Sequence, residues 1–117
     1  MVERCNAVGV RIYVDAVINH MTGGGGAGMG TGGSPYNYDL LEYPAVPYSI
    51  LDFNGPHNCF TASGNIEDYN NRDQVRNCRL SSATDELSDL NPGNEWVQTK
   101  IVGFLNKLIS FGVAGFR

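Results

Sequence analysis

The segment Val10-Arg-Ile-Tyr-Val-Asp-Ala-Val-Ile-Asn-His20 decides the fold class of this chain. Its first half is apolar and β-branched, which is typical of a strand that is buried on both faces. Its second half ends in the polar side chains of Asp15, Asn19 and His20. Because functional groups of parallel α/β sheets lie at the carboxyl ends of strands, we predict a strand over residues 9–18 that delivers these groups to a sheet edge. In the alternative interpretation, Asp15 begins a turn and His20 is an ordinary loop residue.

A helix and a second strand are predicted near the end of the chain. Asn91-Pro92 fits an N-cap followed by proline at the first helical position. Apolar residues then recur at helical spacing, at Val97, Ile101, Phe104, Leu105 and Leu108. Gly112 is the candidate stop of this helix, and residues 113–116 predict a short apolar strand. Strand, helix and strand in this order form a βαβ unit with parallel strands.

The residues between the first strand and the helix predict an insertion. Residues 21–33 form a glycine-rich tract that we expect to be too flexible for regular structure. Residues 34–90 are rich in Tyr, Asn, Asp, Pro and Gly, which favours a long irregular segment with a few short strands. Loops beyond about 15 residues are uncommon unless they are functional, so residues 21–90 are interpreted as a small inserted domain.

A single βαβ unit cannot cover both faces of its own sheet. The chain also ends at Arg117, directly after an apolar residue that is typical of a buried strand. We therefore expect the chain to be a fragment of a longer protein and not to fold alone.

Composition argues against two classes of partner. The chain is 42% hydrophobic and 17% charged, as in globular proteins, and its net charge is −4. It has no basic stripe for nucleic acid and no apolar run of the roughly 18 residues that span a membrane. No signal peptide is visible at its beginning.

Three cysteines, Cys5, Cys59 and Cys78, make an odd number. In an extracellular protein this implies a free thiol or a partner elsewhere. Cys59 and Cys78 flank one loop-like segment without metal spacing, which favours a local disulfide that would stabilise the fold by roughly 3 kcal/mol. Three free thiols in a cytosolic protein are the alternative.

Two superficial motifs are rejected. Residues 28–33 match G-x-G-x-x-G, but Ser34-Pro35 follows where a dinucleotide site needs a helix. Residues 68–79 resemble a calcium loop but place Arg72 and Asp73 where a ligand and the turn glycine belong. Any calcium site must therefore be assembled from separate segments.

Several motifs, in this order, resemble the animal-type α-amylases, which are glycoside hydrolases of family 13. They are Asp-Ala-Val-Ile-Asn-His at 15–20, Ala-Val-Pro-Tyr-Ser at 45–49, Asp-Phe-Asn at 52–54, Ile-Glu-Asp-Tyr-Asn at 66–70, Gln-Val-Arg-Asn-Cys-Arg-Leu at 74–80 and Gly-Val-Ala-Gly-Phe-Arg at 112–117. The resemblance covers the chain apart from the glycine tract and residues 81–88. It implies a fragment of a TIM (β/α)8 barrel: the third barrel strand in residues 1–20, an irregular β-rich domain B in 21–90, and the third helix with the start of the fourth strand in 91–117.

The resemblance also implies a structural calcium ion, which ties the barrel to the insertion. Its ligands would be Asn19, the backbone carbonyl of Arg76 and Asp89, all hard oxygen donors, with a further ligand beyond Arg117. Residues 81–88 are longer than the family norm, which leaves Asp85 as the alternative to Asp89.

Other residues take their expected roles from the same resemblance. His20 and Tyr69 would contact substrate, and Arg117 would bind an activating chloride ion. Asp15 matches a buried, site-supporting carboxylate that pairs with Arg117. Cys59 and Cys78 match the disulfide of the insertion, and the partner of Cys5 would lie upstream.

For the whole protein, the resemblance implies a secreted, monomeric, retaining enzyme that hydrolyses internal α-1,4-glucosidic bonds of starch, glycogen and malto-oligosaccharides. Such enzymes need two carboxyl groups about 5 Å apart, and both would lie beyond Arg117. We therefore expect no catalytic residue in this chain and no activity from it alone. Two alternatives stay open: a related α-glucoside hydrolase or transglycosylase, and a non-catalytic homologue that binds starch or calcium.

Overall fold

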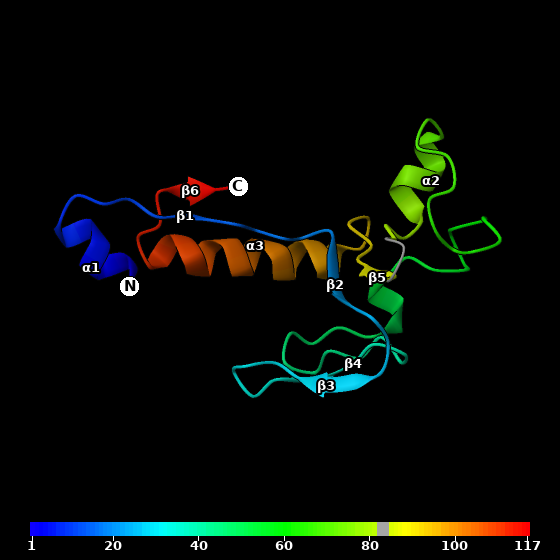
Figure 1. The fold of residues 1–117 in the computed structure, drawn as a ribbon, viewed down its shortest axis with the longest axis horizontal. Coiled ribbons are helices and arrows are strands. Elements are labelled where there is room, and N and C mark those ends of the chain that lie inside the picture. Colours follow the sequence, from blue (N-terminus) through cyan, green and yellow to red (C-terminus); the bar gives the residue numbers. More distant parts are fainter. Residues whose placement is uncertain (82–84) are drawn as a thin grey trace.

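The computed structural model of the protein describes residues 1–81 and 85–117 and shows a small mixed α/β chain. Its longest dimension is 52 Å. Figure 1 shows an extended arm, in which helix α3 (Glu95–Ser110) runs beside the first part of the chain, and two smaller lobes at the far end of that helix. Among the described residues, none of the helices combines the length and apolar character that a bilayer crossing requires.

The predicted βαβ unit is present in the arm. Strands β1 (Tyr13–Val14) and β6 (Gly115–Phe116) pair in parallel, and α3 connects them. The strand prediction over residues 9–18 is wrong in length and in burial, because β1 has two residues and the side chains of residues 11–16 alternate between exposed and half-buried. A strand in a two-stranded sheet has neighbours on one side and a helix on one face, so its other face stays open.

Helix α3 begins later than the sequence predicts. Its N-cap is Asn94, whose Oδ1 accepts a hydrogen bond of 2.8 Å from the backbone N–H of Trp96. Asn91, the predicted cap, lies in the turn before the helix, where its Oδ1 accepts a hydrogen bond from the backbone N–H of Gly93. The predicted stop is confirmed, since Gly112 follows the helix with a φ of +86°, which favours glycine.

A short N-terminal helix, α1 (Val2–Ala7), was not predicted. It lies at the end of α3 that is closest to β6 (Figure 1), and the Asn6 side chain donates a hydrogen bond of 2.9 Å to the carbonyl of Gly112. Cys5 lies in this helix as a half-buried free thiol. Helix α1 therefore joins the end of the arm to the turn after α3.

The glycine tract is ordered, contrary to the prediction. It contributes strands β2 (His20–Gly23) and β3 (Ala27–Met29); β2 pairs with β5 (Leu87–Asp89) and β3 pairs with β4 (Pro35–Asn37), both in antiparallel fashion. The small residues permit close packing, since a Cβ on Gly28 would lie 2.6 Å from the Tyr36 hydroxyl. Glycine here makes room for an aromatic partner rather than preventing pairing.

The buried core lies where the insertion meets the first turn of α3. It contains Tyr43, Tyr48, Phe53, Leu90 and Val97. The Phe53 ring lies 5.4 Å from the Tyr43 ring and 6.1 Å from the Tyr48 ring, measured between centroids. The short 3-10 helix η1 (Ile50–Asp52) directly precedes Phe53 of this core. Of the two lobes, one contains β3 and β4 and the other contains helix α2 (Arg72–Asn77). Core packing therefore fastens the lobe that contains β3 and β4 to one end of the arm.

Candidate functional site

The three predicted calcium ligands line one cavity of about 310 Å³. Asn19 lies directly before β2, Arg76 lies in the last turn of α2, and Asp89 ends β5. The pairing of β2 with β5 sets His20 opposite Asp89 and so brings Asn19 beside that carboxylate. The Asn19 Nδ2 donates a hydrogen bond of 3.1 Å to Asp89 Oδ1. Three segments that are far apart in sequence therefore meet here.

Asp89 is the charged centre of this cavity and is 6% exposed. Its carboxylate accepts hydrogen bonds from two neutral amides, those of Asn54 at 2.7 Å and Asn19 at 3.1 Å. Burial raises the pKa of the Asp89 carboxyl above its ordinary value, while these two hydrogen bonds and the charge of His20 oppose the rise. A buried carboxylate with neutral partners is costly, which makes this site receptive to a cation.

The donor chemistry fits calcium. The cavity offers one carboxylate, the carbonyl-bearing backbone of Arg76, and the Asn19 Oδ1, which accepts no hydrogen bond from the part of the chain that the structure describes. Oxygen donors of this kind are the ligands that calcium prefers. Within residues 1–81 and 85–117, no three His, Cys, Asp or Glu side chains are grouped to hold a metal, so the candidate set relies on amide and backbone oxygens.

The geometry favours Asp89 over Asp85 as the carboxylate of this cavity. Asp85 is exposed, and its Oδ1 lies 3.4 Å from the position that a Cβ on Gly24 would take. Asp89 is buried in the cavity wall. The predicted long connection at residues 81–88 falls partly on residues 82–84, which lie outside the described residues.

A second group of predicted residues lies at the carboxyl ends of β1 and β6. The Arg117 Nη1 atom is 3.0 Å from the Asp15 Oδ2 atom, which confirms the predicted pairing. Both side chains are open to solvent, at 85% and 64% exposed, so the burial expected for Asp15 is wrong for this chain. The cause is the same uncovered face that leaves β1 exposed.

His20 and Tyr69 lie on different elements of the structure. His20 is the first residue of β2, and its Nδ1 is buried without a hydrogen-bond partner among the described residues. Tyr69 is 63% exposed in the loop before α2. The Gln74 side chain holds this loop by accepting from the N–H of Asp68 at 2.8 Å. Among the described residues, no hydrogen bond or ring contact joins the histidine to the tyrosine.

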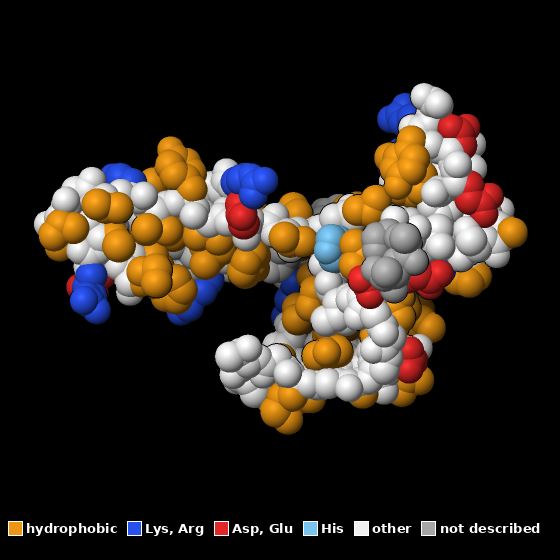
Figure 2. Space-filling model, in the orientation of Figure 1, with side chains coloured by type: hydrophobic (Ala, Val, Ile, Leu, Met, Phe, Trp, Pro, Cys, Tyr) orange, Lys and Arg blue, Asp and Glu red, His pale blue; other side chains and the backbone are white. Residues whose placement is uncertain are grey.

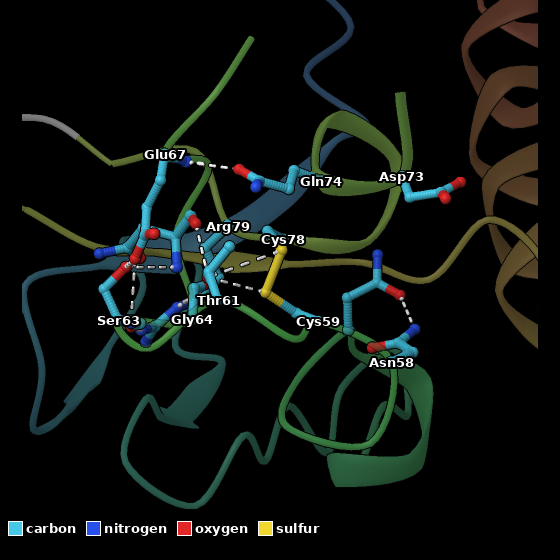
Figure 3. The surroundings of a disulfide bond; sticks show 12 residues. Asn58, Cys59, Thr61, Ser63, Gly64, Glu67, Asp73, Gln74, Cys78 and Arg79 are labelled. Carbon is cyan, nitrogen blue, oxygen red and sulfur yellow. Dashed lines mark hydrogen bonds between the residues drawn. A yellow bond between two sulfur atoms is a disulfide. The ribbon is translucent and has the colours of Figure 1, made fainter. Parts of the chain in front are cut away.

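The disulfide between Cys59 and Cys78 confirms the pairing predicted from the sequence (Figure 3). The two Cα atoms are 4.9 Å apart, and the bond closes a loop that contains α2. The Thr61 Oγ1 atom lies 3.2 Å from the Cys59 sulfur. The bond therefore fastens both ends of the segment that carries Tyr69 and Arg76.

Sequence reasoning missed Asn54. It is buried, and its side chain contacts both Asp89 and the carbonyl of Arg76. The Asp-Phe-Asn motif at 52–54 indicated the insertion but gave no sign of this contact. Its role depends on two partners that lie 22 and 35 positions away in the chain.

The comparison with solved structures decides the relationship. The crystal structure of α-amylase I from Eisenia fetida superposes with a TM-score of 0.91 and 51% identity, over 99% of this chain and 22% of that one. The chain matches a segment of the animal α-amylases. A second structure of the Eisenia fetida α-amylase is a variant in complex with maltohexaose, with the same TM-score of 0.91.

Curated relatives agree with this match. The chain is 53% identical over 117 residues to the α-amylase of Pecten maximus, 56% over 119 residues to human α-amylase 1B and 57% over 120 residues to the pancreatic α-amylase of Sus scrofa. All of this chain is covered each time, and it spans 22% of each of these α-amylases. No protein-family model matches the chain.

Proposed function

We propose that this chain is part of a longer, secreted and monomeric α-amylase. In that protein, residues 1–20 would be the third strand of a (β/α)8 barrel, residues 21–90 domain B, and residues 91–117 the third helix and the start of the fourth strand. The supporting observation is the similarity to α-amylases along the whole chain, in sequence and in fold together. The parallel β1–β6 pair with its crossover helix is the repeating unit of such a barrel.

The proposed activity is the retaining hydrolysis of internal α-1,4-glucosidic bonds in starch, glycogen and malto-oligosaccharides. The maltohexaose complex of the Eisenia fetida enzyme supports this class of substrate. Retaining hydrolysis needs a carboxylate nucleophile and a carboxylic acid about 5 Å apart. We expect the nucleophile two positions after Arg117 and the acid on a later strand, so the chain alone is expected to be inactive.

Calcium would be held by Asn19, the Arg76 carbonyl and Asp89. When bound, it would supply positive charge that fastens three segments of the chain to one point. The work of these residues is mechanical: Asp89 anchors β5, Arg76 anchors α2, and Asn19 anchors the chain between β1 and β2. Together they would keep the insertion aligned with the end of the barrel.

The remaining residues would face the sugar and its reaction site. The His20 side chain is half-buried, and we expect its exposed part, rather than the buried Nδ1, to contact the sugar. The exposed Tyr69 ring is suited to pack against a pyranose face. Arg117 keeps donors beyond the one that binds Asp15 and would hold chloride, placing fixed positive charge near the catalytic carboxylates.

The test is to extend the transcript beyond Arg117 and to assay the full-length product. We expect hydrolysis of starch to malto-oligosaccharides with retained configuration at the new anomeric carbon, as read by NMR. Its control is the same protein with the expected nucleophilic aspartate replaced by asparagine, which should be inactive. Glucosyl transfer without hydrolysis, or binding without any reaction, would contradict the proposal and favour one of the two alternatives.

A further inference from the structure

Asn54 contacts two of the candidate calcium ligands at once. It is 4% exposed, and its Nδ2 atom lies 2.7 Å from Asp89 Oδ2, 3.3 Å from the Arg76 carbonyl and 3.3 Å from the Leu90 carbonyl. The backbone N–H of Asn54 also donates to the carbonyl of Asp89, at 2.9 Å. One side chain thus joins the end of β5 to the last turn of α2.

The orientation of this amide is fixed from the other side. The Asn58 Nδ2 donates to the Asn54 Oδ1 at 2.5 Å, and the Asn58 Oδ1 in turn accepts from the N–H of Gly55 at 2.9 Å. A half-turn of the Asn54 amide would set donor against donor at Asn58 and acceptor against carboxylate at Asp89. The network therefore holds the Asn54 nitrogen toward the two ligand-bearing segments.

We propose that Asn54 is a positioning residue for calcium, a role that rests on the calcium site proposed above. It acts through Asp89 and Arg76 rather than by touching the ion, because the atom it presents to them is a nitrogen donor. When the ligands of a site are already held in place, ion binding costs less conformational entropy and is therefore tighter. Without Asn54, the buried Asp89 carboxylate keeps one amide partner among the described residues, that of Asn19, and the Arg76 carbonyl loses the donor that Asn54 provides.

The experiment measures calcium affinity of the full-length protein by titration against a competing chelator. Asn54→Ala removes the donor, and we expect the calcium dissociation constant to rise about tenfold to a hundredfold, as for other residues that orient metal ligands. Asn58→Ala removes the group that orients Asn54 and leaves both ligands in place, so a smaller rise is expected. Asn65→Ala is the control: it removes a half-buried amide that donates to Glu86 instead of to a proposed ligand, and it should leave the constant unchanged.

Asn54→Asp separates positioning from direct ligation. If Asn54 is a positioning donor, the new carboxylate faces Asp89 and calcium binds more weakly. If this position faces the ion, an added carboxylate binds calcium more tightly, which would overturn the proposal. Melting temperatures with and without calcium add a second readout, because a purely structural role lowers both equally, whereas positioning lowers mainly the calcium-dependent gain.

Two further results would overturn the inference in distinguishable ways. An Asn54→Ala protein that binds calcium as tightly as the wild type would refute the role of Asn54 alone. A wild-type protein that binds no calcium in the same titration would refute the proposed calcium site and this role with it.

Discussion

At the scale of single residues, Asp89 is subject to two opposing requirements. Burial disfavours its charge, whereas its proposed role as a calcium ligand requires the ionised form. We expect Asp89→Asn to raise the calcium dissociation constant of the full-length protein at least about tenfold. Asp85→Asn is the matched control, because it removes an equal charge four positions earlier from an exposed side chain. A larger loss from the Asp85 variant would reverse the assignment.

Tyr48 gives the fold a dependence on alkaline pH. Burial, and secondarily the charge of Asp52, raises the pKa of its hydroxyl above the ordinary value of 10.0. Above pH 10.0 the unfolded chain therefore loses its proton first, so this contribution to stability is complete below that pH and is lost as the pH rises through the raised pKa.

Tyr48→Phe should remove this dependence. We expect the variant to lose less of its free energy of unfolding than the wild type between about pH 9 and about pH 11. Denaturant unfolding at several pH values measures it, and parallel profiles for the two proteins would contradict the expectation. Tyr38 is half-buried, and partial burial raises the pKa of its hydroxyl as well, so it would still contribute to the loss of stability at alkaline pH.

The role of a residue could be predicted where a local sequence motif indicated it. It could not be predicted where the role depends on a contact with a residue far away in the sequence. Cys59 and Cys78 flank a loop, and their pairing followed from that arrangement. Asn91 and Asn94 both suit an N-cap, and local sequence could not choose between them. Asn54 is placed by partners from two other elements, which no local pattern records.

At the scale of elements, local periodicity predicted α3 and the parallel pair that it connects. The prediction for the glycine tract was wrong because its structure does not depend on local periodicity. Strand β2 pairs with β5, which lies more than sixty positions later in the chain. A strand whose stability comes from a remote partner leaves little trace in its own residues. Because glycine has no side chain, the tract shows no strand pattern in its sequence. The same lack of side chains allows the strands to pack closely.

Gly23 is the position where this close packing is tightest against backbone. A Cβ there would lie 2.8 Å from Leu87 Cδ2 and 3.1 Å from the carbonyl of Glu86. We expect Gly23→Ala to loosen the β2–β5 pair and to lower the free energy of unfolding by about 1–3 kcal/mol. Gly32→Ala is its control, since a Cβ at that position meets nothing within 4 Å, and it should change stability by about 0.5 kcal/mol at most. Equal effects of the two variants would contradict the packing argument.

At the scale of the whole molecule, the arm exposes many apolar side chains (Figure 2). Those of the first segment and of α3 include Val10, Tyr13, Val17, Val102, Phe104 and Ile109. Apolar surface of this extent marks an interface with other parts of a protein. The sequence predicted this feature, because one βαβ unit lacks the neighbours that cover it.

The isolated 117-residue chain is therefore expected to lack a cooperative thermal transition. Among the described residues, the core cluster lies at one end of α3, and the side chains of β1 and β6 are exposed or half-buried. Calorimetry and circular dichroism on the isolated chain check this expectation. A single sharp transition seen by both methods would show that the arm needs no further cover.

The loop that the Cys59–Cys78 disulfide closes affects how the protein responds to proteolytic cleavage. Arg72 and Arg76 lie inside this loop and are exposed, so trypsin-like enzymes have two cleavage sites there. A cut at either site would break the backbone without releasing a piece, because the sulfur bridge still links both sides. The nicked protein would run as one band on a gel and separate into two after reduction, and the three proposed anchoring segments would stay in one covalently linked molecule after the first cut.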